Sequence, residues 1–321
     1  LYISSLDSSA GRLSQITKQH WAIESMHWDL DRNLRQDSIK RKAERAAGNL
    51  DTIQRMVLAL IAVWKNRRNR QELDQVNQIV LTGMVLSTAP VGEYDRRVVI
   101  LTKEQGKISA FARGARRPNS PLVGAVNPFS FGEFTMYEGR SSHTIQSVKI
   151  TNYFSELRED MIGAYYGFYF LEFANYYTKE QNDEREMLKL LYQTMKALTS
   201  PHIPNLLIRR IFELKAFCIN GEGPQVFQCV RCQKKDGQMV FSAREGGLVC
   251  TDCARNISDG ISLDNSTLYT MQYIEISTIE KLYTFTVSRE VLEKLSGIME
   301  RYCLLYVEKR FKSLEILETL V

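Results

Sequence analysis

Four cysteines at metal-ligand spacing are the residues of this chain whose types most directly define a chemistry. Cys229 and Cys232 form one C-x-x-C pair, Cys250 and Cys253 form a second, and 17 residues separate the pairs. Each pair lets two thiolates bind one ion from a tight turn, and the loop between them brings the pairs together. Because all four positions are cysteine, the pattern predicts a closed, structural site for one Zn²⁺ ion. A disulfide pair or a redox centre is the alternative.

Turn residues that would position these cysteines flank both pairs. A hydrophilic run at 234–237 follows the first pair, and Gly246-Gly247 precedes the second. The loop at 226–256 has little apolar content, too little in our interpretation to hold its own shape, so we expect the metal to pin it. The other cysteines, Cys218 and Cys303, lie in apolar helical stretches, where buried and inert thiols are expected.

A second group of residues, basic ones between Tyr94 and Pro118, indicates contacts with phosphate. Seven basic residues fall within 22 positions there, against only Asp95 and Glu104. Such clustering predicts nucleic-acid binding. The candidate phosphate contacts are Arg96, Arg97, Lys103, Lys107, Arg113, Arg116 and Arg117. Aromatic residues nearby could stack on bases if they face the groove, but we expect them to fill the interior: Phe129, Phe131, Phe134 and Tyr137.

The elements that carry the basic residues have the pattern of strands. Five are expected within residues 78–155, at 78–90, 95–101, 107–113, 128–138 and 143–152. Lys103-Glu104-Gln105-Gly106 is expected to be a hairpin turn, with glycine where positive φ is needed. Five antiparallel strands in so short a stretch predict a small closed barrel, an OB-fold.

Residues 156–321 have helical patterns, and the cysteine loop interrupts them. Helices are expected at 156–181, 184–199, 203–220, 265–277, 288–307 and at the C-terminus. The first is apolar almost all round, which is typical of a central buried helix. Asn220-Gly221 predicts a left-handed helix C-cap. The predicted fold class is therefore α+β and multidomain: a helical N-terminal fragment, a five-stranded OB-fold barrel, and an all-α domain with an inserted four-cysteine zinc loop.

Charge is unevenly distributed along the chain. Residues 1–70 hold 13 Lys and Arg against 7 Asp and Glu, a balance of +6, whereas residues 71–321 hold 29 against 30, a balance of −1. The asymmetry suggests two pieces of different origin, joined by a linker at 71–77. No apolar run approaches the roughly 20 residues of a membrane span, and there is no secretory signal, so we expect a cytoplasmic protein; the family resemblance given below would make it bacterial and associated with the nucleoid.

The first piece, residues 1–70, is expected to be helical. Its segments HWAIESMHWDLD and GNLDTIQRMVLALI resemble the C-terminal end of DDE-class insertion-sequence transposases. The resemblance implies that Glu24 corresponds to the third metal-binding carboxylate. We expect no transposase activity, because two-metal chemistry needs several carboxylates and the family's two aspartates belong to a core that is missing here. Ser25 also replaces the usual asparagine. A start at Leu1 would fit a truncated gene fused to its downstream neighbour.

The second piece resembles the RecO family of bacterial DNA repair proteins over residues 78–321. The resemblance rests on GMVLSTAPVGEYDRRVVILTKEQGKISAFARGARRPNS, the aromatic helix, IRRIFELKAFCINGEGP and the four cysteines. It implies a recombination mediator that binds single- and double-stranded DNA, anneals complementary strands, contacts the single-stranded-DNA-binding protein SSB, and with RecR helps RecA load onto SSB-coated strands. By this likeness the seven basic residues would contact DNA. Arg209 and Arg210 are weaker candidates for binding the acidic SSB tail.

We expect no enzymatic activity from this sequence. It has no Walker A loop, no nucleophile signature, and only four histidines without metal-ligand spacing. Two other functions compete with the mediator. One is an inactive or partial DDE transposase fusion, and the other is a zinc-stabilised scaffold without a role on DNA.

Overall fold

The computed structural model describes residues 56–61, 78–139 and 142–320. Residues 56–61 are helical, as expected for that part of the chain. The rest of the N-terminal fragment, Glu24 included, lies outside the described residues. Gln78–Val321 forms one compact unit, distinct from the residues before it.

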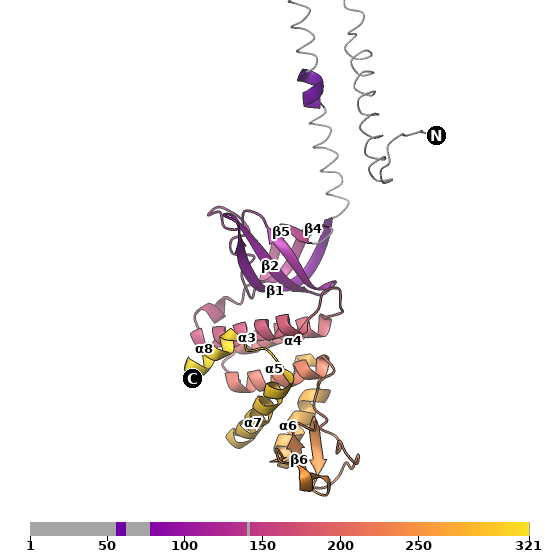
Figure 1. Ribbon diagram of the computed structural model, residues 1–321. Coiled ribbons are helices and arrows are strands. Elements are labelled where there is room, and N and C mark those ends of the chain that lie inside the picture. Colours follow the sequence, from indigo (N-terminus) through magenta and orange to yellow (C-terminus); the bar gives the residue numbers. More distant parts are fainter. Residues whose placement is uncertain (1–55, 62–77, 140–141, 321) are drawn as a thin grey trace, which may run out of the picture. The chain divides into compact units, whose positions relative to one another are not determined.

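The first part of this unit is a closed five-stranded barrel (Figure 1). Its strand order is β1-β2-β3-β5-β4, and all neighbours are antiparallel except β3 and β5. The strands are β1 (Gln78–Val91), β2 (Asp95–Thr102), β3 (Gly106–Ala112), β4 (Phe131–Glu138) and β5 (His143–Asn152). This arrangement confirms the predicted OB-fold-like barrel.

Local sequence explains most of the barrel. Burial alternates along β3 from Gly106 to Ala112, as in a strand with one face inward. Gly106 adopts φ 65°, which confirms the predicted hairpin turn. β4 begins later than expected, at Phe131, because Phe129 adopts φ 74° and leaves the extended conformation. Its ring then lies over helix α3 (Met161–Tyr177) beside Gly167, where a Cβ atom would lie 2.8 Å from the ring.

Strand β1 contributes side chains to two cores, because successive side chains along a strand point to opposite faces. The register with β2 shifts between Val85 and Ser87. Val85 lies in the interior of the barrel, whereas Met84 and Leu86 belong to the larger core that the helices form. Leu101 of β2 also joins the larger core. The barrel and the helices therefore share apolar packing and do not meet only at polar surfaces.

The helices lie in successive layers away from the barrel (Figure 1). α3 and α4 are nearest to it, α5 follows, and α6 and α7 lie farther away, while α8 returns to lie against α3. Their bounds are α3 (Met161–Tyr177), α4 (Arg185–Leu198), α5 (Asn205–Ile219), α6 (Asn265–Ile276), α7 (Arg289–Tyr306) and α8 (Lys312–Leu320), with short 3-10 turns η2 (Ser155–Arg158) and η4 (Ile279–Lys281). None of the helices in the described part of the chain is long and apolar enough to cross a membrane.

The aromatic helix is buried, as predicted, but shorter than expected. Phe170 and Phe173 are fully buried and contact Phe212 of α5 with ring centroids 4.5 and 5.5 Å apart. The helix begins only at Met161, because Phe154 takes a left-handed conformation and a separate 3-10 turn follows it. α5 ends at Ile219, and Gly221 has φ 78°, which confirms the predicted C-cap.

The cysteine loop contains more structure than its composition indicated. It forms most of a three-stranded sheet in the order β7-β6-β8, with β6 (Met239–Ser242), β7 (Gly247–Cys250) and β8 (Ile261–Ser262), and a 3-10 turn η3 (Cys253–Asn256). Phe241 and Val249 are fully buried and join the main core. The loop thus adds large apolar side chains to the main core, and the expectation that a metal is needed to pin it stays a prediction.

Candidate nucleic-acid interface and metal centre

The structure divides the seven predicted DNA contacts between two ends of the β2–β3 ladder. Arg96 pairs with Ala112 at one end, and Thr102 pairs with Gly106 at the other. Thr102 lies six positions after Arg96 along β2, which is about 20 Å at roughly 3.3 Å per residue. We call the first group the arginine end; it consists of Arg96, Arg97, Arg113, Arg116 and Arg117. Lys103 and Lys107 lie at the opposite, lysine end.

Neutral oxygen acceptors hold several of the arginine-end side chains. Arg96 donates to Oδ1 of Asn127 at 2.7 Å, and Nε of Arg97 donates to Oγ of Ser109 at 2.8 Å. Arg116 donates to the carbonyl of Gly92 at 3.1 Å. Within residues 78–139 and 142–320, no carboxylate forms an ion pair with any of the five. Their charges are therefore not neutralised by the described residues and can attract phosphate.

An exposed tyrosine, which the sequence interpretation missed, lies within the arginine end. Tyr94 is 44% exposed, and the guanidinium of Arg117 lies over its ring, 5.0 Å from the centroid. The aromatic residues considered for stacking lie elsewhere: Phe134 fills the barrel interior, Phe129 lies in the larger core, and Phe131 packs against Tyr192 at 4.5 Å. Tyr137, near the end of β4, is only partly exposed. The position of Tyr94 directly before the basic run was the signal available in the sequence.

The lysine end contacts the loop that joins α3 and α4. Nζ of Lys107 donates to the carbonyl of Asn175 at 2.7 Å, and backbone bonds link Lys107 to Lys179 and Gln181 to Gln105. Burial lowers the pKa of Lys107 and outweighs the nearby carboxylate of Glu180. A side chain at Gly106 would come within 2.4 Å of the carbonyl of Asn182. Lys107 thus ties the barrel to the helices, while Lys103 is exposed on the turn.

The four cysteines converge on one point in the inserted sheet. All four sulfur atoms lie within 4.8 Å of one another, and Sγ of Cys232 is 3.6 Å from Sγ of Cys250. A tetrahedral ion with Zn–S bonds of about 2.3 Å would place its sulfur ligands about 3.8 Å apart. Cys250 ends β7, Cys253 begins η3, and the first pair lies in a turn closed by the bond from Cys229 N to Lys234 O at 2.8 Å. The cluster can hold a metal ion, and its all-thiol donor set suits a soft cation.

The thiols of this cluster differ in acidity because their sulfur atoms have different hydrogen-bond partners. Burial opposes ionisation of the Cys229 thiol. Hydrogen bonds from nearby backbone N–H groups, including that of Cys250, outweigh burial and lower its pKa to about 6. Hydrogen bonding with the Cys250 and Cys232 side chains raises the pKa of Cys253 to about 12. Four thiolates so close together repel each other, and a divalent cation would remove that cost while displacing the remaining protons.

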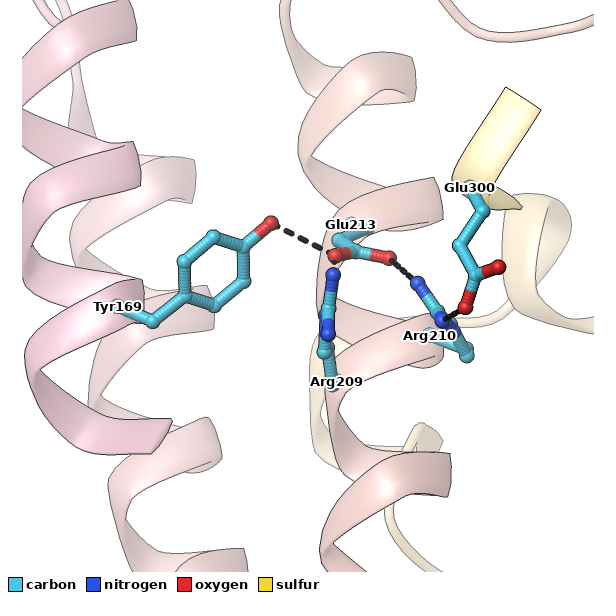
Figure 2. Close-up of polar contacts among 5 residues, drawn as sticks. All are labelled: Tyr169, Arg209, Arg210, Glu213 and Glu300. Carbon is cyan, nitrogen blue, oxygen red and sulfur yellow. Dashed lines mark hydrogen bonds and ion pairs between the residues drawn. The ribbon is translucent and has the colours of Figure 1, made fainter. Parts of the chain in front are cut away.

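Arg209 and Arg210 do not lie on the surface. Figure 2 shows Glu213 of α5 between both arginines and Tyr169 of α3. Glu213 is fully buried and accepts from Tyr169 OH at 2.6 Å, Arg209 Nε at 2.7 Å and Arg210 at 3.0 Å. Arg210 also pairs with Glu300 of α7. Binding of an acidic peptide by these arginines stays a prediction, and it would require them to exchange their contacts with Glu213.

The charged network around Glu213 was not found from the sequence. Arg209 and Glu213 are four residues apart on one helix, a spacing that usually marks an exposed ion pair. Burial by α3 and α7 turns it into an internal network. The positive charges of Arg209 and Arg210 outweigh the effect of burial, which opposes ionisation, and lower the pKa of Glu213.

The fold and the two sites together define a class of protein. It has an OB-fold-like barrel with five arginines at one end that no carboxylate of the described residues pairs, joined through a shared core to a helical domain that carries a four-cysteine cluster. Two family models match this architecture. The model described as "Recombination protein O N terminal" matches residues 76–154, and the model described as "Recombination protein O C terminal" matches residues 158–315.

Curated relatives agree with the family models. A protein named "DNA repair protein RecO" from Alkaliphilus metalliredigens is 34% identical over 236 residues, which are 73% of this chain and 96% of the relative. Proteins of the same name from Acetivibrio thermocellus and Symbiobacterium thermophilum are 29% and 30% identical, over 76% and 74% of this chain and 98% and 96% of their own lengths. The chain therefore belongs to the RecO family of DNA repair proteins. The transposase-like resemblance of residues 1–70 lies outside the matched regions and stays a prediction.

Proposed function

We propose that this protein is a recombination mediator that binds single- and double-stranded DNA through the arginine end and anneals complementary strands. With RecR it would help RecA load onto strands coated by SSB, in the bacterial cytoplasm and on the nucleoid. The observation that carries the proposal is the arginine end itself. Five guanidinium groups lie at one end of the barrel, and the described residues neutralise none of them with a carboxylate. Family membership supports the role in DNA repair.

Phosphate binding by this surface has a measurable electrostatic signature. Each phosphate that an arginine neutralises releases counterions from the nucleic acid, so affinity falls as salt rises. The bonds to Asn127 and Ser109 hold Arg96 and Arg97 in place without consuming their charge. The arginine end should therefore attract DNA of any sequence, as a mediator that acts along whole strands requires.

The four cysteines would bind one structural Zn²⁺ ion in this proposal. Four thiolates in a closed arrangement are the usual ligands of structural zinc and leave no open position for water. The centre lies in the inserted sheet, away from the barrel (Figure 1). Its contribution would be to the shape of the helical domain.

A charge-matched comparison of variants tests DNA binding. In the full chain, alanine replaces all five residues of the arginine end, and a control variant loses five exposed basic residues that have carboxylate partners: Arg185, Lys189, Arg231, Arg289 and Lys294. Fluorescence anisotropy with single-stranded and duplex oligonucleotides at several salt concentrations gives affinity and salt slope. We expect the first variant to lose at least about tenfold in affinity and roughly 0.7 in slope per lost contact on single strands, and the control to lose much less.

Two outcomes would count against the proposal. Equal losses in both variants would mean that net charge, and not the arginine end, governs binding. Unchanged binding and unchanged annealing of SSB-coated complementary strands in the five-arginine variant would favour a scaffold without a role on DNA.

A further inference from the structure

Tyr94 has the position and exposure of a ligand contact. It lies in the turn between β1 and β2, two residues before Arg96, and its side chain is 44% exposed. A large aromatic side chain left this open loses the stabilisation that burial would provide. Arg117 lies over its ring, so a planar cation and an aromatic ring are already adjacent at the arginine end.

The backbone around Tyr94 is held from several directions. The carbonyl of Tyr94 accepts from the N–H of Arg116 at 2.9 Å, and the carboxylate of Asp95 accepts from the N–H of Gly114 at 2.7 Å. These bonds tie the β1–β2 turn to the loop after β3. Gly114 has φ 67°, and the side chain of Arg117 lies 3.7 Å from where a Cβ of residue 114 would be. A platform ordered before binding loses less conformational entropy when a ligand arrives.

An unpaired nucleobase is the ligand that fits this chemistry. Every base offers a flat π-face that stacks on tyrosine or on a guanidinium plane, and the neighbouring arginines would contact its phosphates. In a duplex the base faces are already stacked on each other, and exposing one costs a few kcal/mol. Glu93 precedes Tyr94 and is exposed, so its carboxylate would repel phosphate on its own side of the turn. The phosphates of a bound DNA strand would then lie on the side of the arginines.

We propose that Tyr94 and Arg117 form a stacking platform for one unpaired base, which makes the arginine end prefer single-stranded over duplex DNA. The inference rests on the proposed function, because it assigns the part of the nucleic acid that this end contacts. The arginines supply affinity for any phosphate backbone, and the platform adds affinity that only a strand with free bases can use.

Three ligands separate stacking from phosphate binding in the full-length protein. They are an oligothymidylate, an abasic strand of equal length that keeps the phosphates, and a duplex. Stacking on one base is worth about 1–3 kcal/mol, so we expect Tyr94→Ala to weaken oligothymidylate binding roughly 5- to 150-fold. Binding of the abasic strand and the duplex should change by less than about twofold, and all three salt slopes should stay the same.

Conservative and electrostatic controls complete the test. Tyr94→Phe keeps the ring and should bind oligothymidylate like the unchanged protein, whereas Arg117→Ala should weaken all three ligands because it also removes a charge. Equal losses on the three ligands in Tyr94→Ala would show that the ring only orders the arginines, and no loss on any would show that no base reaches it. Either result overturns the stacking inference and leaves the proposed function standing. Failure of the unchanged protein to bind any of the three ligands would refute both.

Discussion

Replacing Glu213 by glutamine tests how far the buried arginines depend on one carboxylate. The substitution keeps the size of the side chain and removes its charge. Glu213 is fully buried, and the side chains of Arg209 and Arg210 are only 10% and 1% exposed. After the change, two guanidinium groups would remain in the interior with Glu300 as the acidic partner shown in Figure 2, and that side chain is 58% exposed.

The magnitude of this effect follows from the difference between buried and exposed pairs. Removing one member of a buried ion pair costs about 3–5 kcal/mol, because the remaining charge stays desolvated. Glu300→Gln is the matched control, since it removes a carboxylate from the same Arg210 at the surface, where a pair contributes about 1 kcal/mol or less. We therefore expect Glu213→Gln to lower the free energy of unfolding several-fold more than Glu300→Gln.

Urea unfolding followed by circular dichroism measures both variants. The three tryptophans, Trp21, Trp28 and Trp64, all precede the barrel in the sequence, so the helical domain has no tryptophan of its own. The far-ultraviolet helix signal and the near-ultraviolet tyrosine signal report on its unfolding. Equal destabilisation by the two variants would refute the reasoning, because it would mean that the interior tolerates unpaired guanidinium groups.

The same network predicts a pH dependence. The arginines hold the pKa of Glu213 below its ordinary value in the folded protein, against the opposing effect of burial. Its contribution to stability is then complete above the ordinary carboxyl pKa of about 4.3 and is lost as the pH falls through the lower, folded pKa. Glu213→Gln should abolish this part of the acid destabilisation, and a variant with the acid profile of the unchanged protein would contradict the assignment.

Two further predictions concern the cysteine cluster and the lysine end. Cys250→Ser should lose the metal, measured by elemental analysis, and should lower the unfolding temperature, because β7 is part of the main core. The control Cys218→Ser should keep the metal. A Cys250→Ser protein as stable as the unchanged protein would contradict a structural role. Lys107→Met should cost about 1–2 kcal/mol in urea unfolding through loss of its bond to Asn175, yet leave the salt slope of DNA binding unchanged. A reduced slope with unchanged stability would show that Lys107 contacts phosphate instead.

Local sequence predicted the barrel well, and the departures have non-local causes. A short apolar run in β2, alternating burial in β3 and the turn glycine between them suffice to define this hairpin, because these signals act within a few residues. The start of β4 could not be predicted in this way. Phe129 leaves the strand conformation to pack against Gly167, a residue 38 positions later in the sequence.

The candidate sites show the same division. The four-cysteine cluster could be predicted from the sequence, because the spacing of the two C-x-x-C pairs is itself typical of a metal site. The sequence does not predict that the basic cluster is split between two ends of the barrel. Lys107 lies at the end of the β2–β3 ladder that contacts the α3–α4 region, and Arg96 lies at the other end, which only the packing of the helices decides. Likewise, the burial of Arg210 depends on the packing of α3 and α7 around α5. In each case the deciding neighbour comes from a distant part of the chain.

The core shared by the barrel and the helices has a thermodynamic consequence. Met84, Leu86 and Leu101 belong to the core that α3 and α4 form against the barrel, so we expect the parts matched by the two family models to unfold together. Two parts that unfold together also share the free energy of any ligand that binds the folded state. DNA held at the arginine end would thus raise the unfolding temperature of the distant cysteine cluster, and metal bound there would help preserve the barrel surface that holds the DNA. Binding at the two sites would thus be coupled through folding, and a ligand at either site would raise the unfolding temperature measured at the other.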